Sequence, residues 1–489
     1  MGRLNLTTLL AMSLTPLVSC TPKTADTDSG DGTIEIIGGV EDADGDSILD
    51  EHEGTDDADG DGLSDTDEAG IYGTDPHDRD SDGDGYTDGA EVTGGSDPLD
   101  SGSDLGLAWV VINDWAATEH ILSVELDVEY VDLAFVLDTT CSNAGVLTSA
   151  ALGFADIAAG LGARVDSPMY GVATFDDYNY SGMGSNGDKP FTLNQQITDD
   201  EGLLESTLEG LGIHSGLDAQ ESGMEALYQA LTGAGYDQDC YGSYTSSTDV
   251  RPFVADPKDP FGGIAGGAGA PAGVGDIGGM GFRLHALPIL LYATDTYIRD
   301  PDSTNSTLAV TPGGCPIDAA SSDVARAVAA LGAYLIGFDI SGASTLYGPL
   351  EQMEALALAT GSLADMDGDG DADDPLVISA NQSLDDFAVT FKEESLLALE
   401  RLLDSVVWGT VAVEVTNDPA GLVTSVSPEV YSDVETSTLD TLDFTLSLDD
   451  AAAPAAEDDQ HFLLSFYVIG NDSVLLNTYD VVLTVSGAP

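Results

Sequence analysis

Basic residues are scarce in this 489-residue chain, where 12 Lys+Arg stand against 88 Asp+Glu and give a formal net charge of −76. Nucleic acids and anionic lipid surfaces bind clustered positive charge, so neither is an expected partner. The chain also holds only six histidines, and none falls in a recognisable metal-binding or catalytic-triad motif. The composition therefore favours cations as ligands, either bound calcium or a calcium-rich medium, and argues against an enzyme.

Long apolar runs are missing too. The run at residues 9–18 is too short to span a bilayer and follows Arg3, so we interpret residues 1–20 as a cleaved signal peptide. Its end, Leu17-Val-Ser-Cys20, resembles the lipobox of bacterial lipoproteins, in which the cysteine is acylated. With Thr21 rather than Asp after Cys20, the resemblance implies a bacterial outer-membrane lipoprotein at the cell surface, held in the membrane only by its lipid. An ordinary signal peptide that contains a cysteine is the alternative.

Only three cysteines remain after Cys20. In an oxidising compartment this number allows one disulfide and one free thiol. Cys240 and Cys315 both lie in Gly-rich, loop-like sequence and are the favoured pair. Cys141 lies in a polar loop after an apolar stretch, and we expect it to be a buried thiol.

Acidic residues are abundant, and after a flexible polar tether at residues 21–41 they become regularly spaced. Three loops carry carboxylates at positions 1, 3, 5, 9 and 12, which is the spacing of calcium-binding loops; the second and third also have Gly at position 6, where the first has Ser47. The predicted calcium ligands are Asp42, Asp44, Asp46, Asp50 and Glu53 in the first loop, Asp57, Asp59, Asp61, Asp65 and Glu68 in the second, and Asp80, Asp82, Asp84, Asp88 and Glu91 in the third.

Residues 42–104 contain almost no apolar residue that could build a core, so calcium must order them; a disordered acidic spacer is the alternative. With Gly-Thr-Asp-Pro at 73–76 and Gly-Ser-Asp-Pro at 95–98, the array resembles bacterial thrombospondin type 3 repeats. A fourth acidic loop offers Asp365, Asp367, Asp369 and Asp373 as calcium ligands. Its position 12 is Leu376, so one ligand is missing or replaced.

The mostly apolar residues 131–137 predict a strand buried on both faces, and Asp138, Thr140 and Ser142 follow it on one tight loop. Strands and helices alternate over residues 131–406, which predicts a doubly wound α/β domain. Ligand sites in such sheets lie where loops leave the carboxyl ends of strands. A carboxylate with two hydroxyls suits a hard divalent cation and leaves it attracted to another anionic oxygen. The alternative is an ordinary Asp/Ser/Thr turn.

This Asp-x-Thr-x-Ser loop resembles the metal-ion-dependent adhesion site (MIDAS) of von Willebrand factor A domains. Gly216-Leu-Asp218-Ala-Gln-Glu221 is similar to a signature of the integrin β-subunit I-like domain, in which a later strand also ends in Thr-Asp, as at Asp295. The resemblance implies that one Mg²⁺, Mn²⁺ or Ca²⁺ ion is shared by Asp138, Thr140, Ser142, Glu221 and Asp295.

The resemblance also implies that the partner is a protein or acidic glycan whose carboxylate binds this ion. A second, flanking ion would use Asp177, Asp218 and Glu221, although Gly216 stands where the family has Asn. The family's adjacent regulatory ion is not expected, because Asn-Ala-Gly-Val follows Ser142 where the family has Met and two Asp. A degenerate domain that keeps the fold without the metal is the alternative.

Residues 407–489 alternate as strands between turn-rich segments, which predicts a small β-sandwich, and residues 105–130 alternate in the same way. Integrin β subunits insert their I-like domain into a β-sandwich, so the resemblance implies that residues 105–130 pair with this C-terminal domain. The whole pattern predicts a lipid-anchored, calcium-binding cell-surface adhesin or receptor. A calcium-stiffened stalk without a specific ligand is one alternative. An enzyme subunit that uses Asp138 and Glu221 as acid and base is the other.

Overall fold

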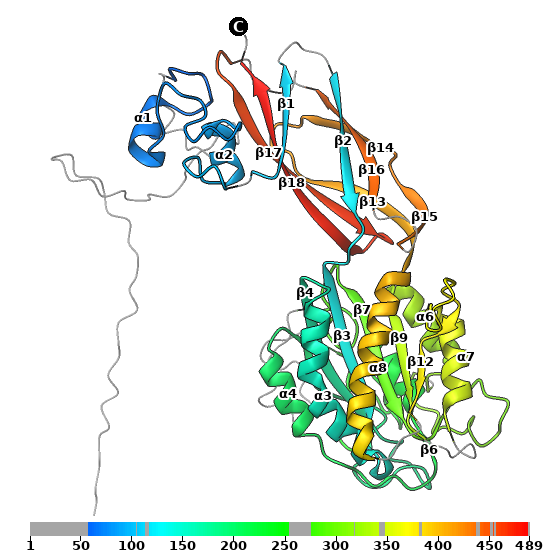
Figure 1. Cartoon of the computed structure of the whole chain (residues 1–489). Helices are drawn as coiled ribbons and strands as arrows, with labels where there is room; N and C mark the ends of the chain where they lie inside the picture. The colour runs from blue at the N-terminus through cyan, green and yellow to red at the C-terminus, as the bar shows by residue number, and fades with distance from the viewer. Residues whose placement is uncertain are drawn as a thin grey trace, which may run out of the picture. The chain divides into compact units, whose positions relative to one another are not determined.

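The structure is a computed structural model in which most of the chain after residue 56 is described (Figure 1). The described residues are 57–103, 105–112, 117–253, 275–316, 318–341, 348–380, 384–436, 441–449, 453 and 456–487. The predicted signal peptide with Cys20, the tether, and the first acidic loop with Asp42, Asp44, Asp46, Asp50 and Glu53 lie outside these residues.

A six-stranded sheet forms the centre of the α/β domain, in the order β12-β9-β7-β3-β4-β5. Every neighbouring pair is parallel except β4 and β5. In chain order this is 6-5-4-1-2-3, the arrangement of a doubly wound fold, whose ligand crevice lies between the first and fourth strands. Its strands are β3 (Tyr130–Asp138), β4 (Ser167–Phe175), β5 (Thr192–Thr198), β7 (Leu287–Thr294), β9 (Tyr334–Asp339) and β12 (Val377–Ser379).

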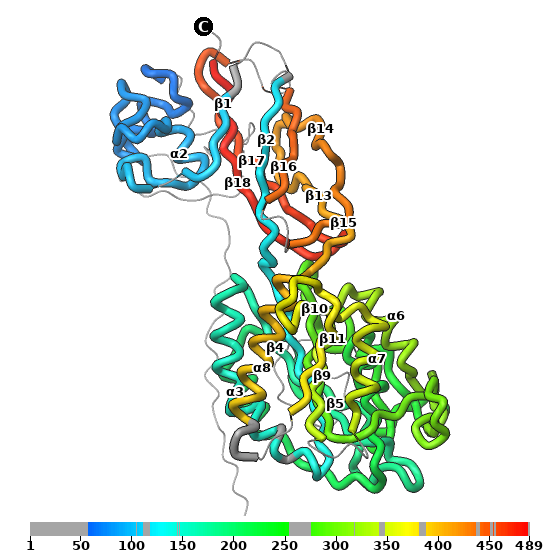
Figure 2. The backbone as a smooth tube through the Cα atoms, turned by 45° about the vertical axis from the view of Figure 1, so that its right-hand side comes forward, coloured from blue at the N-terminus to red at the C-terminus, as the bar shows by residue number. Residues whose placement is uncertain are grey.

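Helices cover both faces of this sheet, and Figures 1 and 2 show α3 and α8 on the face opposite to α6 and α7. The two faces follow from the alternation along β3, because Leu133 and Phe135 belong to one buried cluster and Ala134 and Val136 to another. The helices are α3 (Ala144–Gly162), α4 (Glu201–Glu209), α5 (Gly223–Thr232), α6 (Ser321–Leu331), α7 (Leu350–Thr360) and α8 (Leu384–Ser405).

Two further sheets combine strands from before and after the α/β domain. One has the order β1-β18-β17-β13-β15 and the other β14-β16-β2, so residues 105–130 do pair with C-terminal strands. Inward side chains of both sheets, such as Val124, Phe444 and Phe466, share one hydrophobic cluster. The strands are β1 (Leu107–Ile112), β2 (Ala117–Glu125), β13 (Val407–Asn417), β14 (Val423–Ser427), β15 (Tyr431–Glu435), β16 (Thr441–Asp449), β17 (Gln460–Gly470) and β18 (Val474–Ser486).

The second and third acidic loops form a small unit with three short helical segments, α1 (Asp65–Asp67), η1 (Glu68–Tyr72) and α2 (Asp88–Gly94). Gly62 and Gly85, at position 6 of each loop, have φ values of +95° and +107°, which explains why glycine stands there. The unit packs on β17 and β18, where Ala90, Leu105 and Val482 form a small apolar cluster.

Polar contacts complete this packing. His461 Nε2 donates to the carbonyl oxygen of Asp61 at 2.5 Å, which leaves Nδ1 to accept from the Thr484 hydroxyl at 2.8 Å. Arg79 forms an ion pair with Asp459. Burial lowers the pKa of His461 and so favours the neutral ring, in which one nitrogen donates and the other accepts.

Cys240 and Cys315, the pair that the sequence favoured, form a disulfide. Cys141 is exposed, and the expectation of a buried thiol is therefore wrong. It begins the 3-10 turn η2 (Cys141–Asn143), whose buried side chain is Asn143. Among the described residues, no helix combines the length and the apolar character that crossing a membrane would require.

Candidate metal centre

Asp138 ends β3 next to the carboxyl end of β7, and its carboxylate accepts hydrogen bonds on both oxygens. Oδ1 accepts hydrogen bonds from the Thr140 amide at 2.8 Å and the Thr140 hydroxyl at 2.7 Å. Oδ2 accepts from the hydroxyl of Thr294, the last residue of β7, at 2.6 Å. All three residues are buried. The neighbouring parallel strands therefore orient the same carboxylate that the sequence placed at the centre of the site.

Ser142 and Asp295, which follow β3 and β7, contact each other beyond the ends of these strands. The Ser142 hydroxyl donates to Asp295 Oδ1 at 3.1 Å. Asn143 Nδ2 donates to that oxygen at 3.0 Å and to the Thr140 hydroxyl at 3.3 Å. Asn143 was not among the predicted site residues, because Asn after a Ser/Thr loop has no spacing signal of its own. It joins the loops after β3 and β7.

Glu221 approaches from a third segment, the short strand β6 (Gln220–Glu221), which pairs in parallel with β8 (Tyr297–Ile298). A Cβ atom added to Gly216 would lie 3.5 Å from both Glu221 Oε1 and Thr140 Cγ2. Glu221 therefore lies close to the loop after β3. Glu221 Oε2 is buried and has no hydrogen-bond partner among the described residues. A buried carboxylate oxygen without a donor is unfavourable unless a cation or a proton neutralises it.

The electrostatics of these carboxylates favour the binding of a cation. Burial, reinforced by the charge of Asp138 and its acidic neighbours, raises the pKa of Glu221 to about 11. Burial also raises the pKa of Asp138 to about 7 and that of Asp295 above its usual range. All the donors are oxygen atoms, which suits Mg²⁺, Mn²⁺ or Ca²⁺. The predicted residues therefore fit a hard divalent ion, which Asp138, Thr140, Ser142, Glu221 and Asp295 would hold.

At the predicted flanking metal site, the carboxylates of Asp177 and Asp218 bind an arginine side chain. Asp177 and Asp218 are bound by the guanidinium of Arg299, whose Nε lies 2.8 Å from Asp177 Oδ1 and whose Nη2 lies 2.7 Å from each Asp218 oxygen. Arg299 is almost fully buried. We therefore correct the prediction of a second ion at Asp177 and Asp218, because a positive side chain takes the place where a metal was expected.

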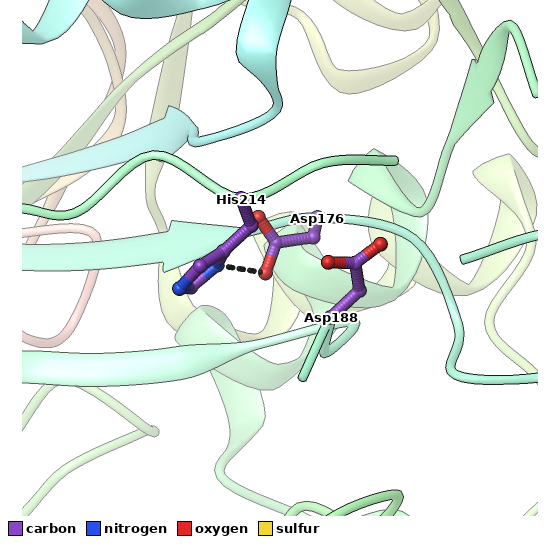
Figure 3. Close-up of side chains that lie close together, drawn as sticks. All are labelled: Asp176, Asp188 and His214. Atoms are coloured by element: carbon purple, nitrogen blue, oxygen red, sulfur yellow. Dashed lines mark hydrogen bonds and ion pairs between the residues drawn. The ribbon is translucent and has the colours of Figure 1, made fainter. Parts of the chain in front are cut away.

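A second group of side chains, Asp176, Asp188 and His214, lies beside this site (Figure 3). His214 Nδ1 is 2.7 Å from Asp176 Oδ2, and the Thr139 hydroxyl donates to Asp176 Oδ1 at 2.5 Å. The His214 amide donates to the Thr139 carbonyl at 2.8 Å. The sequence gave no motif for this group. The hydrogen bonds of this group connect the segment before Gly216 to the loop that follows β3.

Replacing His214 by asparagine should lower stability more at pH 6 than at pH 9. The hydrogen bond to Asp176 raises the pKa of His214 above its usual value. A raised histidine pKa contributes stability that is fully present below the unfolded-state pKa and is lost as pH rises through the folded-state pKa. Thermal unfolding of both proteins across this pH range measures the difference. A melting difference that does not change with pH would show that the histidine contributes only by packing.

The second and third acidic loops are folded so that their carboxylates gather. Asp57 Oδ1 accepts from the Gly60 amide at 2.7 Å, and Asp80 Oδ1 accepts from the Gly83 amide at 2.8 Å. Position 9 folds back to position 2 in both loops, because Asp65 accepts from Ala58 N and Asp88 from Ser81 N. The first three acidic side chains of each loop gather within 4.8 Å, as Asp57, Asp59 and Asp61, and as Asp80, Asp82 and Asp84.

Unpartnered oxygens point to the ions that these loops would hold. Both oxygens of Asp59 and one oxygen each of Glu68, Asp82 and Glu91 are buried without a hydrogen-bond partner among the described residues. Burial raises the pKa of Glu68 to about 8 and that of Glu91 to about 7, with acidic neighbours adding to the shift. These are residues at positions 3 and 12, so the donors fit calcium at the predicted spacing.

The fourth acidic loop departs from the prediction at one residue. Asp365, Asp367 and Asp369 gather as in the other loops, and Asp365 Oδ1 accepts from Gly368 N at 2.7 Å. The carboxylate that folds back to Met366 N, at 3.1 Å, belongs to Asp374, whereas the predicted ligand Asp373 is exposed. The loop therefore has one more residue before its closing carboxylate, because Asp374 belongs to β11 (Asp374–Pro375), which pairs with β10 (Leu363–Ala364).

Comparison with known families identifies the acidic loops. The model of the bacterial TSP3 repeat matches residues 57–78 and 80–101, which contain the second and third loops. These segments are bacterial TSP3 repeats, as their spacing predicted. No curated protein matches the chain.

Several solved structures match parts of the chain at low identity. A von Willebrand factor type A protein from Catenulispora acidiphila has 8% identity and a TM-score of 0.31, and the match covers 78% of this chain and 72% of that one. The pilus adhesin SpaC from Lactobacillus rhamnosus GG, in its open conformation, has 12% identity, a TM-score of 0.30 and coverages of 76% and 46%. Proximal thread matrix protein 1 of the mussel byssus, with a zinc-occupied MIDAS motif, has 12% identity, a TM-score of 0.28 and coverages of 57% and 48%. The chain spans less than half the length of the last two.

Proposed function

We propose that this protein is a metal-dependent adhesin or receptor that binds a carboxylate-bearing protein or acidic glycan. The observation that carries the proposal is the convergence of three segments at the carboxyl ends of β3 and β7, where Glu221 Oε2 is buried near Asp138 without a hydrogen-bond partner among the described residues. A doubly wound sheet binds ligands at this position. A divalent ion held there with one coordination position open would take a partner's carboxylate as a further oxygen ligand.

Each side chain would have its own part in this mechanism. Asp138 supplies the fixed anionic ligand, since Thr140 and Thr294 hold it in one orientation. Ser142 is exposed and marks the side from which a partner would approach. Asp138, Glu221 and Asp295 are not among the described acidic groups that gather within 4.8 Å, so binding one ion requires these side chains to move closer.

The test of the proposal is a binding array with matched ligands. It presents uronate-containing glycans beside the same glycans with each carboxyl group reduced to an alcohol, and Asp-containing peptides beside their Asn twins. We expect the full chain to bind a carboxylate ligand in Mg²⁺ or Mn²⁺, and to lose it both in excess chelator and on the reduced twin. Binding that is equally strong with the metal and in excess chelator would contradict the proposal, and so would hydrolysis of any ligand.

The remaining domains would present this site. We propose that the two sheets built by β1, β2 and β13–β18 form a β-sandwich between whose strands the α/β domain is inserted. The TSP3 repeats pack on its β17 and β18 strands through His461 and Arg79. This contact favours a calcium-stiffened stalk as the second candidate function. The stalk alone would explain a protein that binds calcium but retains no ligand on the array.

We also propose that Cys20 carries the lipid that attaches the protein to the outer membrane. Leu17-Val-Ser-Cys20 supports this proposal, together with Thr21 after the cysteine. Mass spectrometry of the mature protein should find Cys20 as the N-terminal residue with acyl chains attached. A mature N-terminus at another residue, or an unmodified Cys20, would remove the lipid from the account.

A further inference from the structure

Arg299 is a buried cation within the group of carboxylates that surrounds the candidate metal centre. Its side chain is 2% exposed, and that of Asp177 is 1% exposed. Arg299 Nε lies 2.8 Å and 2.9 Å from the two Asp177 oxygens, and Nη2 lies 2.6 Å from Asp177 Oδ2. The same Nη2 is 2.7 Å from both oxygens of Asp218. One guanidinium therefore forms ion pairs with two carboxylates from separate loops.

The backbone of Arg299 is fixed directly to Glu221. Its amide donates to the Glu221 carbonyl at 2.8 Å and extends the pairing of β6 with β8. The residue before it, Ile298, is held on the other side by Gln352, which accepts from its amide at 2.9 Å and donates to its carbonyl at 2.7 Å. Arg299 therefore links three segments: the loop after β4, the loop that leads to Glu221, and β8.

Several neighbouring carboxylates and the guanidinium of Arg299 together determine the electrostatic potential at Glu221. Asp177 and Asp218 both add negative charge near its carboxylate, as Asp138 does. Without Arg299, these carboxylates would repel one another and Glu221, and the cost would fall mainly on the buried Asp177 and Glu221. A planar guanidinium suits this position because its rigid fork of donors matches two carboxylates at once.

We propose that Arg299 is an internal cation that replaces a second divalent ion and positions Glu221, so that the candidate metal centre binds a single ion without needing calcium beside it. The inference rests on the proposed metal at Asp138. It makes Arg299 a positioning residue, because its guanidinium bonds Asp177 and Asp218 and only its backbone contacts Glu221. The charge is permanent, so this part of the site does not vary with the calcium concentration.

Replacing Arg299 by alanine tests the inference. The variant has Asp177 and Asp218 facing a space that no cation fills, so it should bind one more calcium ion per chain than the wild type, counted by equilibrium dialysis. Its Mg²⁺ affinity in calcium-free buffer should fall about 10- to 100-fold, the usual effect of losing a group that orients a metal ligand. Adding calcium in the millimolar range should restore that affinity. Arg299→Lys should gain no calcium site and lose less Mg²⁺ affinity, because it keeps the charge but not the fork.

Arg283→Ala is the matched control. Arg283 also binds a fully buried carboxylate, with Nε 2.7 Å from Asp132 Oδ1. Asp132 lies near the start of β3, at the opposite end from Asp138. This variant should lose stability, gain no calcium site and keep the wild-type affinity for Mg²⁺.

Three results would overturn the inference: an Arg299→Ala protein with unchanged Mg²⁺ affinity, one with an unchanged calcium count, or one whose lost affinity calcium does not restore. The first and third would leave Arg299 as a structural ion pair like Arg283. If the wild type and Asp138→Asn show the same Mg²⁺ binding, the proposed function fails instead. The calcium count of Arg299→Ala against the wild type then still decides whether Arg299 stands in for an ion.

Discussion

Replacing Asp138 by asparagine is expected to abolish Mg²⁺ binding at the end of β3 and to leave the fold intact. Asparagine keeps a carbonyl oxygen that can accept from Thr140 or Thr294, so the hydrogen bonds that join β3 to β7 are largely preserved. It removes the anionic ligand itself. The loss of affinity should therefore exceed the roughly 10- to 100-fold that is typical of losing an outer-shell partner.

The metal-free protein should tolerate this change and gain stability at alkaline pH. Burial raises the pKa of Asp138 to about 7. A carboxyl group with a raised folded-state pKa destabilises the fold as pH rises from its unfolded value through that pKa, because the folded protein holds the proton more tightly. The advantage of Asp138→Asn should therefore be larger at pH 8 than at pH 5. Asp138→Ala should gain less, since it leaves the Thr140 and Thr294 donors unpaired.

Calorimetry with MgCl₂ and thermal unfolding in chelator check both parts. Ser142→Ala should weaken Mg²⁺ binding less than Asp138→Asn does, because a neutral hydroxyl contributes less than a carboxylate to a hard cation. Asp443→Asn is the control for a general change of charge, since Asp443 is exposed on β16 and accepts only from Ser123 among the side chains that are described. If Asp138→Asn binds Mg²⁺ as tightly as the wild type does, the Asp-x-Thr-x-Ser loop is only a turn.

The sequence predicted what depends on local pattern. The apolar residues before Asp138 form β3 because burial on both faces removes the alternation of a half-exposed strand. The alternation of strands and helices expected over residues 131–406 is present from its first pair, in which α3 follows β3. Asp138, Thr140 and Ser142 follow each other on one loop, so their proximity needs no long-range information. The calcium loops were visible for the same reason, since each is contained within 12 residues.

What the sequence could not predict depends on contacts between distant segments. Arg299 lies far along the chain from Asp177, and a single arginine after a short strand has no pattern that indicates its partners. Asp373 had the right spacing for a loop ligand, but it is Asp374, in β11 paired with β10, whose carboxylate folds back to the amide of Met366. Cys141 was expected to be buried because its loop directly follows the buried strand β3, yet it lies in the turn η2 with its side chain exposed.

Removing calcium is expected to unfold residues 57–101 and to release them from β17 and β18. Apolar contact there is small, with Ala90, Leu105 and Val482 at its centre. The carboxylates of the two repeats, by contrast, lie within 4.8 Å of one another in groups of three. Without an ion, their repulsion and the unpartnered oxygens of Asp59 act against the folded loops.

The packing on the sheet depends on the loop conformation. His461 is buried and donates to the backbone carbonyl of Asp61, inside the second loop, so it loses its partner if that loop opens. The pKa of Asp61 is raised to about 7 and that of Glu68 to about 8, chiefly by burial. Raised carboxyl pKa values favour the folded state when the groups are protonated, and that stability is lost as pH rises. The metal-free repeats should therefore be less stable at pH 8 than at pH 5.

Hydrogen exchange of the full chain, with calcium and after its removal, measures this prediction at pH 8. In calcium, amides of residues 57–101 and of β17 beside His461 should be protected; without it, both should exchange quickly while β3 and β7 keep their protection. Protection should return as calcium is raised through about 10⁻⁴ to 10⁻³ M, the range of extracellular calcium modules, and Mg²⁺ should not replace it because it demands shorter, octahedral coordination. Asp59→Asn, which removes a carboxylate with no donor in the metal-free loop, should raise the calcium concentration required. If the repeats stay protected without calcium at pH 8, their fold comes from packing on the sheet, and calcium is not what orders them.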